Sequence, residues 1–309
     1  LLGMAGADRV QGGGGGDVLR GGDGADYLDG QAGDDAIDGG AGPDVLYGLA
    51  GNDRIAGGAG GDYLDGGPGE DVLGGGRDTD VLIGGRGRDR LAGQGGDDRA
   101  FTEAGEPVIG AAQTATVSLD TPGRSIQVEG TPEFVARVQS DLDALRSTAS
   151  GTDMLAALDR ASVASRPVAA QLPFVGDAGM AGHTLVIRET AAANGFAGWS
   201  TAMLGPVSAH IDYNPAFHHL PEAGQVPPVV VLYHELAHIY DAYCGTVASG
   251  VFTGADNPGV PNREREAVGL PIDADADPAT PDALHPGHPY PLTENGLREE
   301  FGLSPRRRY

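Results

Sequence analysis

The chain has no lysine, one cysteine and no long apolar run, and each of these absences narrows what the protein can be. All 20 basic residues are arginine, and against 44 acidic residues they leave a formal net charge of −24. Such a surface repels nucleic acid and anionic membranes, so we expect neither as a partner. Cys244 alone cannot form an internal disulfide. Because no run of 18 apolar residues occurs, we expect no membrane span.

Glycine and proline, in contrast, are abundant, with 53 and 21 of the 309 residues. Their excess is uneven along the chain, and a chain of this length has room for two or three domains. Composition alone therefore predicts more than one domain. The first residue is Leu1 and no signal-like segment follows it, so the sequence does not identify the true N-terminus of a precursor.

Residues 3–101 divide into eleven nonapeptides without an insertion. The sixth position is always aspartate, the fourth is glycine except at Asp78, and the eighth is aliphatic, ending with Ala100. A glycine-rich turn followed by a three-residue strand predicts a parallel β-roll with one apolar side chain per strand packed inside. Its turns bring oxygen atoms of successive repeats together, as Ca²⁺ requires. The expected calcium ligands are Asp8, Asp17, Asp26, Asp35, Asp44, Asp53, Asp62, Asp71, Asp80, Asp89 and Asp98.

This pattern resembles the repeats-in-toxin (RTX) family, whose repeat is Gly-Gly-x-Gly-x-Asp-x-apolar-x. The resemblance implies a secreted protein whose repeats are disordered at low calcium and fold outside the cell. The residues favour the same behaviour, because one aliphatic side chain in nine buries little surface and close carboxylates repel until a cation neutralises them. Asp78 departs from the pattern, which puts the adjacent cation sites in question. The alternative is a disordered acidic linker, which would not require so strict a register.

A second pattern, His-Glu-Leu-Ala-His, occupies residues 234–238. On a helix, His234 and His238 project from one face about one turn apart and can bind the same metal ion. Glu235 then lies where it can take a proton from a water molecule on that metal. This is the zincin signature and indicates a zinc hydrolase. The alternative is an amphipathic helix with two surface histidines.

The chain after the repeats predicts an α+β catalytic domain. Pro227-Pro228 and Gly245 mark the ends of the expected metal-binding helix. The strand ending at Tyr213 is a candidate to offer its edge to a substrate backbone. We expect helices over 132–145, 153–161 and 228–244, and strands over 116–119, 125–129, 184–188 and 208–213. The expected domains are the roll at 1–101, a linker at 102–124 and the catalytic domain at 125–309.

Two histidines leave a catalytic zinc one protein ligand short. In metzincins a histidine stands six residues after the second histidine, but that position holds Cys244 here. We interpret Cys244 as a small buried residue near the helix end. His285 and His288 are a second possibility, although the prolines around them predict a kinked loop.

The segment 262–271, Asn-Arg-Glu-Arg-Glu-Ala-Val-Gly-Leu-Pro, contains the best candidate. A glutamate on a later helix, about 26 residues past the second histidine, is the gluzincin arrangement. Together the two segments resemble the bacterial zinc metalloprotease effectors delivered by type III secretion, in which Glu-Arg-x-Ala-Val-Gly follows His-Glu-x-x-His. The resemblance implies that Glu264 is the third zinc ligand, and Glu266 is the alternative.

The C-terminal residues resemble the same effectors from Thr293 onward. Clostridial neurotoxin light chains carry an Arg-x-x-Tyr pair that stabilises the tetrahedral transition state, and Arg306 and Tyr309 match its spacing. The resemblance implies a catalytic role for both, whereas an arginine cluster by itself is typical of a solvated tail. Asp241, one turn beyond His238, is a candidate to orient an imidazole, with capping or a solvated position as alternatives.

These patterns predict an N-terminal all-β RTX solenoid followed by an α+β zincin-like metalloprotease domain. The expected function is a secreted, effector-like or toxin-like zinc endopeptidase that acts on a protein or peptide substrate and uses Zn²⁺ and Ca²⁺. The competing hypothesis is a calcium-binding surface or adhesive protein with an inactive zincin-like domain. The intact Glu235 disfavours it, because a domain that no longer cuts has no chemical need for that carboxylate.

Overall fold

The structure is a computed structural model of the whole chain. It describes residues 1–117, 122–164, 185–191, 196–200, 208–215, 219–220, 224–244, 260–270 and 289–307. The chain forms two compact units. Unit 1 contains Leu1–Thr121, Pro132–Ala149 and Gln225–Val229, and unit 2 contains Pro122–Thr131, Ser150–Gly224 and Val230–Tyr309.

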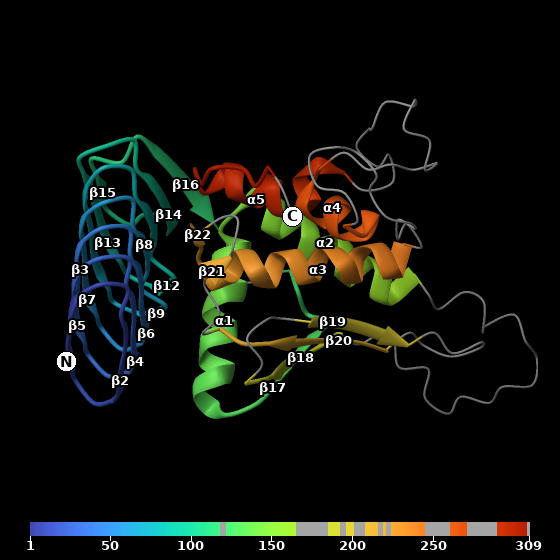
Figure 1. Cartoon of the computed structure of the whole chain (residues 1–309), viewed down its shortest axis with the longest axis horizontal. Coiled ribbons are helices and arrows are strands. Elements are labelled where there is room, and N and C mark those ends of the chain that lie inside the picture. Colours follow the sequence, from blue (N-terminus) through green and yellow to red (C-terminus); the bar gives the residue numbers. More distant parts are fainter. Residues whose placement is uncertain are drawn as a thin grey trace, which may run out of the picture. The chain divides into compact units, whose positions relative to one another are not determined.

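The nonapeptides of unit 1 build the expected parallel β-roll (Figure 1). Successive repeats alternate between two seven-stranded sheets, so each strand pairs with the strand 18 residues later, as Leu28 does with Leu46. One sheet contains β1 (Leu2–Ala5), β3 (Val18–Asp23), β5 (Ala36–Ala41), β7 (Arg54–Ala59), β10 (Val72–Arg77), β13 (Arg90–Gln94) and β15 (Val108–Ile109). The other contains β2 (Arg9–Gly14), β4 (Tyr27–Ala32), β6 (Val45–Ala50), β8 (Tyr63–Asp65), β11 (Val81–Ile83), β14 (Arg99–Glu103) and β16 (Gln113–Val117). A minor sheet pairs β9 (Pro68–Gly69) with β12 (Arg86–Gly87).

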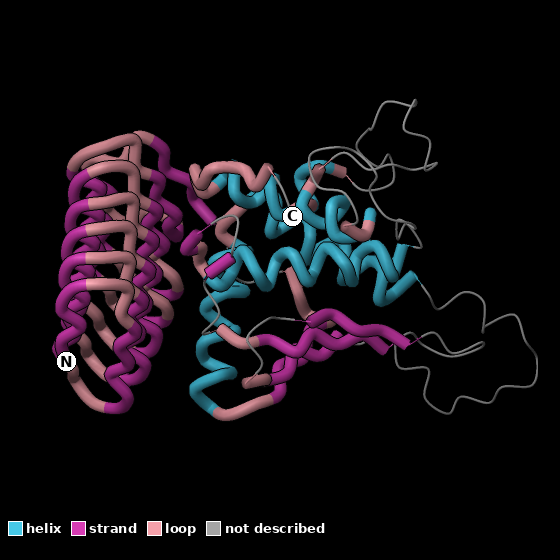
Figure 2. Tube along the Cα trace, in the orientation of Figure 1, coloured by secondary structure: helices cyan, strands magenta, loops and turns pink. Residues whose placement is uncertain are grey.

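The eighth position of the repeat forms the core of the roll, as the pattern predicts. From Leu19 to Ala100 each of these side chains is at most 3% exposed and packs in one continuous row. The strands are longer than expected, because backbone pairing continues into the glycines of the next repeat and gives six residues in β2 to β7. The two sheets and the turns between them are distinct in Figure 2.

The roll continues beyond residue 101, into the expected linker at 102–124. β15 pairs with β13 and β16 pairs with β14, so both sheets gain a strand after the repeats end. The Glu106 carboxylate accepts a 3.3 Å hydrogen bond from the backbone amide of Asp89. It takes the place that the aspartate of a further repeat would occupy. The linker was therefore placed too early, since strand pairing does not require the repeat motif itself.

Helix α1 (Pro132–Arg146) starts directly after Thr131, as expected, but it belongs to unit 1 with the roll. The sequence had assigned these residues to the catalytic domain. α1 lies against β6 (Figure 1). The pattern of apolar residues predicted the helix correctly but carried no information about which unit it would join.

Unit 2 contains a four-stranded sheet with the order β17 (Ile126–Glu129), β18 (Leu185–Glu189), β20 (Ser208–Tyr213) and β19 (Phe196–Ser200). The first three strands are parallel and β19 is antiparallel to β20. The idea that the strand ending at Tyr213 offers a free edge is wrong, because β20 is paired on both sides. A further sheet pairs β21 (His219–Leu220) with β22 (Gly224–Gln225).

The helices α2 (Ala149–Ala164), α3 (Pro228–Cys244), α4 (Asn262–Val268) and α5 (Glu294–Glu300) lie on one side of this sheet, with the 3₁₀ turn η2 (Tyr290–Leu292) before α5 (Figure 1). The helices and mixed sheet confirm the α+β expectation. Among the described residues, no helix combines the length and apolarity needed to cross a membrane.

Candidate metal sites

Helix α3 carries both histidines of the zincin signature and is firmly embedded in the fold. Its start at Pro228 and its end at Cys244 agree with the sequence prediction. Tyr233, fully buried, places its hydroxyl 2.9 Å from the Ser150 carbonyl oxygen and 2.8 Å from that of Pro291. The residue before His234 is thus held by the first turn of α2 and by η2. These contacts fix α3 at the point where it carries the two histidines.

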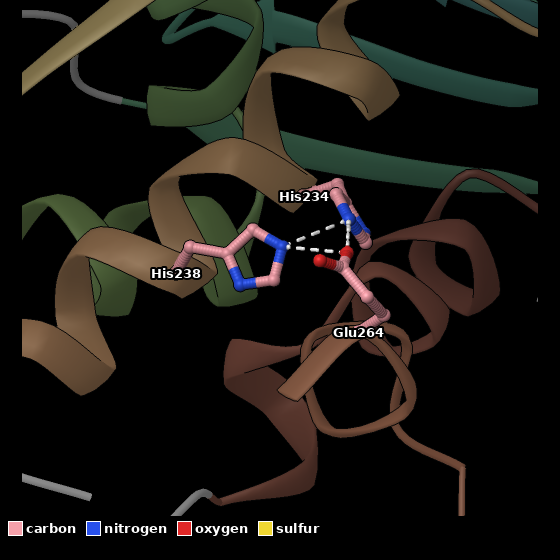
Figure 3. Close-up of side chains that lie close together, drawn as sticks. All are labelled: His234, His238 and Glu264. Carbon is pink, nitrogen blue, oxygen red and sulfur yellow. Dashed lines mark hydrogen bonds and ion pairs between the residues drawn. The ribbon is translucent and has the colours of Figure 1, made fainter. Parts of the chain in front are cut away.

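Three side chains converge beside α3 (Figure 3). The Nε2 atoms of His234 and His238 are 3.2 Å apart, and Glu264 Oε2 lies 3.5 Å from the first and 3.1 Å from the second. Within the described part of the chain, these residues are the one group of three whose ligand atoms come close enough to hold a metal ion. The structure therefore brings together the ligand set that the sequence assigned to zinc.

The distances fit a tetrahedral ion. Ligand atoms that each lie about 2.0–2.1 Å from zinc are roughly 3.3 Å from one another, which matches the three separations of 3.1–3.5 Å. Two imidazole nitrogens aimed at each other also need a shared cation or proton between them. Nitrogen and carboxylate donors are the ligands that catalytic zinc uses.

Glu264 owes its position to the short helix α4. It lies in the first turn, where its charge is favourable near the helix N-terminus. The helix ends at Gly269, which has a φ of 86° and so adopts the left-handed conformation. A Cβ at Gly269 would be 2.5 Å from Thr293 Oγ1, so glycine lets the end of α4 approach the start of α5.

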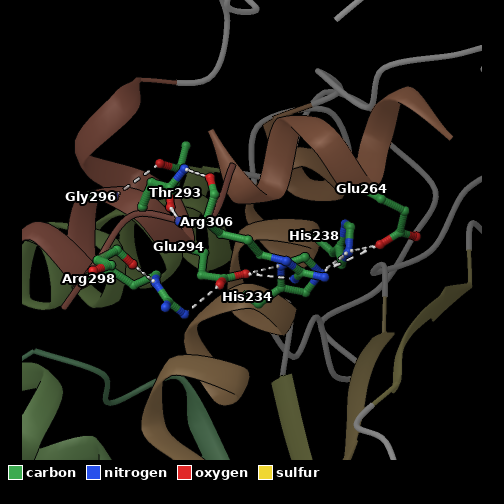
Figure 4. A network of polar contacts seen from close by, with 10 residues as sticks. His234, His238, Glu264, Thr293, Glu294, Gly296, Arg298 and Arg306 are labelled. Atoms are coloured by element: carbon green, nitrogen blue, oxygen red, sulfur yellow. Dashed lines mark hydrogen bonds and ion pairs between the residues drawn. The ribbon is translucent and has the colours of Figure 1, made fainter. Parts of the chain in front are cut away.

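Glu294 at the start of α5 holds the other side of His234 (Figure 4). Its Oε2 is 3.2 Å from His234 Nδ1, and the carboxylate also accepts hydrogen bonds of 3.3 Å from Arg298 and Arg306. Its side chain is 1% exposed. This buried carboxylate fixes the ring orientation and directs Nε2 toward the candidate metal position. The sequence analysis missed it.

The carboxylates around His234 set its protonation. Burial lowers the pKa of His234, but hydrogen bonds to Glu264 and Glu294 raise it more, to about 10. Burial raises the pKa of Glu264, while the hydrogen bonds from the two histidines bring it well below its usual range. The pKa of Glu294 is likewise lowered on balance, by His234 and the two arginines against burial. Without a metal the site retains a proton, so a metal ion and a proton compete for it.

The other predicted zinc-site residues are placed as follows. Glu235 lies next to His234 on α3 and is 9% exposed. Glu266 is buried on α4 and is not part of the converging group. Asp241 is 2% exposed, so a solvated position is wrong for it. Cys244 is exposed, so its interpretation as a buried residue is also wrong: the last turn of α3 leaves it at the surface.

The predicted transition-state pair is only partly described. Arg306 is tied to α5 twice, through Glu294 and through Asn295, whose side chain exchanges two hydrogen bonds with the Arg306 backbone at 2.6 and 2.9 Å. The arginine tail up to this residue is therefore anchored and not solvated. Tyr309, like His285 and His288, lies outside the described residues.

The repeat aspartates form two ladders along the roll. In nine successive pairs, the Oδ1 atom of one aspartate accepts a hydrogen bond of 2.7–3.0 Å from the backbone amide of the aspartate 18 residues earlier. The ladder passes Asp78 without interruption, since Asp62 and Asp80 both take part. In the described roll, Oδ2 is buried without a hydrogen bond in Asp8, Asp35, Asp44, Asp53, Asp62, Asp71, Asp80, Asp89 and Asp98.

These buried oxygens are the structural case for calcium. A Cβ at Gly39 would be 2.4 Å from Asp44 Oδ2 and 2.7 Å from the Gly57 carbonyl oxygen, so only glycine fits between the two oxygens. Burial raises the pKa of Asp53 to about 6 and that of Asp62 to about 8, and neighbouring aspartates add to the rise against the amide hydrogen bonds. Neutral pH would leave such carboxyls partly protonated unless a cation is bound, and oxygen-rich sites suit Ca²⁺.

Comparison with known proteins finds a family model for each part of the chain. Residues 2–37, 38–73 and 74–109 each match the family model of the RTX calcium-binding nonapeptide repeat, so the N-terminal array is a calcium-binding one. No curated protein and no solved structure matches the chain. Residues 122–309 match the family model Peptidase_M91, described as an effector protein. Since this match covers more than half of the chain, the protein belongs to the Peptidase_M91 effector family.

Proposed function

We propose that the protein is a zinc-dependent endopeptidase that works outside the cell that makes it. The observation that carries the proposal is the convergence of His234 Nε2, His238 Nε2 and Glu264 Oε2 within 3.5 Å of one another. Membership of a peptidase effector family indicates a protein or peptide substrate. The calcium-binding repeats favour an extracellular site of action, where calcium is abundant.

In the proposed mechanism His234, His238 and Glu264 would hold zinc. When bound, zinc supplies Lewis-acid chemistry, which polarises the scissile carbonyl and makes water acidic enough to attack it. Glu235 takes the proton from the attacking water and returns it to the leaving amine nitrogen. Its position next to His234 on the buried face of α3 supports this role.

We further propose that Arg306 and Tyr309 stabilise the oxyanion of the tetrahedral transition state. The ion pair between Arg306 and Glu294 supports the first assignment, because it keeps the guanidinium in the network attached to His234. The domain division in this proposal takes 1–117 as the calcium roll and 125–309 as the peptidase segment. Helix α1 falls within the peptidase segment by sequence but packs in the unit of the roll.

The decisive test compares the wild type with Glu235→Gln, both loaded with calcium and zinc, in a peptide-library digest. We expect the variant to lose at least about 10²-fold in cleavage rate, the lower end for a general base, while its zinc content stays at the wild-type level. The exposed residue Glu299 offers a matched control, and Glu299→Gln should cleave normally. A wild type that binds zinc but cuts nothing would favour a calcium-binding surface protein instead.

A further inference from the structure

The two outer faces of the roll differ in burial. On β3, β5 and β7 the residues on either side of the core position are exposed, as Val18 and Arg20 show. On the other sheet the corresponding residues are buried over four consecutive strands. This buried face, the covered face, consists of Tyr27, Asp29, Val45, Tyr47, Tyr63, Asp65, Val81 and Ile83.

Arg137 of α1 is the central contact to the covered face. Its guanidinium carbon lies 3.0 Å from the centre of the Tyr47 ring and 5.6 Å from that of Tyr27, and its Nη1 donates a 2.6 Å hydrogen bond to the Tyr27 hydroxyl. The centre of the Tyr47 ring lies in turn 5.6 Å from that of Tyr63, with the two rings tilted by 49°. Arg137 thus contacts β4 and β6 directly, and the Tyr47–Tyr63 pair extends this contact to β8.

Charged contacts surround this aromatic cluster. Arg137 Nη1 is 3.9 Å from Asp29 of the roll, and its Nε is 3.5 Å from Asp141 one turn along the helix. Nearby, Arg86 of the roll binds Asp143 of α1 with two hydrogen bonds of 2.6 and 3.1 Å. The Arg137 side chain is only 3% exposed. A guanidinium buried so deeply is stable only while its partners are in place.

Except for Asp141 on α1 itself, the partners of Arg137 lie on the roll and are in place only when it is folded. One aliphatic residue per repeat buries little surface, and the buried Oδ2 atoms of the aspartates need a cation, so the roll depends on calcium. Residues 225–229 belong to the same unit as the roll and α1, and they include the first two residues of α3. α2 likewise begins in this unit, at Ala149.

We propose that the calcium-loaded roll is the template on which α1 folds, so that calcium binding orders the start of the peptidase segment as well as the repeats. The covered face is the docking surface and α1 is its occupant. The roll is then a structural part of the peptidase segment, and calcium controls when that segment is complete. This inference does not require the protein to cleave peptides.

Hydrogen–deuterium exchange on the full chain tests it. Calcium is titrated into calcium-depleted protein at constant zinc, and the protection of backbone amides is followed in β6 and α1. We expect α1 to become protected with the same calcium midpoint as β6. If α1 keeps its protection without calcium, as a helix of an independent peptidase domain would, the proposal is wrong.

A pair of arginine variants tests the anchor. At saturating calcium, Arg137→Ala should lower protection of α1 by at least about a hundredfold, because it breaks a buried charge cluster, while β6 stays protected. Arg54→Ala, on the exposed face of β7, should leave α1 unchanged. Tyr47→Ala provides the same test from the roll side in case Arg137→Ala folds poorly. Equal α1 protection in Tyr47→Ala and Arg54→Ala would overturn the role of the covered face.

Discussion

Replacing Glu294 by glutamine should weaken zinc binding without removing any ligand. The glutamine has the same size and can still reach His234 Nδ1, but the negative charge that holds the imidazole is lost. Arg298 and Arg306 then face a neutral amide in a buried position. Second-layer partners of zinc histidines typically contribute 10–100-fold in metal affinity, which corresponds to about 1.4–2.8 kcal/mol.

The assay is competition for zinc against a chromophoric chelator at constant calcium and pH. Glu299→Gln on the same helix is the matched control, because it removes one carboxylate from an exposed position. Urea unfolding of the zinc-free proteins separates a loss of zinc affinity from a loss of stability. If Glu294→Gln binds zinc as tightly as the wild type and the control, Glu294 does not position His234.

Three further predictions follow from the two metal sites and from α1. Glu264→Gln should abolish stoichiometric zinc binding measured by elemental analysis, whereas Glu266→Gln should retain it; the reverse result would exchange the two assignments. Asp53→Asn should raise the calcium concentration at the folding midpoint in circular dichroism, and Asp38→Asn, at an exposed position of β5, should not. Burial raises the pKa of Asp65 to about 8, with Asp141 adding to the rise and Arg137 opposing it. The folded state therefore retains a proton that the unfolded state releases near pH 4, and this contribution to the free energy of unfolding falls as pH rises toward 8. The free energy of unfolding, measured by urea unfolding at saturating calcium, should therefore decline less steeply with pH in Asp65→Asn. Parallel curves of this free energy against pH for variant and wild type would contradict the prediction.

Much of the fold could be predicted because its signals are local. The aspartate and aliphatic positions of each nonapeptide lie two residues apart, and the same spacing recurs without insertion, so the roll and its core required no knowledge of distant contacts. Helix α3 could be predicted in the same way, since proline and glycine mark its ends and both histidines lie on one face. Glu264 was reached through the family resemblance, because its spacing alone did not separate it from Glu266.

Other features depend on contacts between residues that are far apart in the chain. Glu294 follows His234 by 60 positions, and nothing in its own helix reveals that its carboxylate is buried against an imidazole. The docking of α1 does have a signature in the sequence of the roll. Tyr27, Tyr47 and Tyr63 stand at outward positions of the same sheet, where the opposite sheet has exposed residues. Large aromatic side chains at such positions indicate a face that something else covers.

The calcium roll and the candidate zinc site should respond to the loss of their cation in different ways. Calcium would neutralise a long row of buried carboxylates, so its removal acts on every repeat at once and on α1, which rests on the covered face. The candidate zinc site has three ligand atoms, and without the metal a proton on His234 can satisfy Glu264 and Glu294. Zinc removal should therefore leave the helices around the site in place. Calcium removal should act on folding. In our proposals calcium therefore decides whether the peptidase segment is assembled, and zinc decides whether it can react.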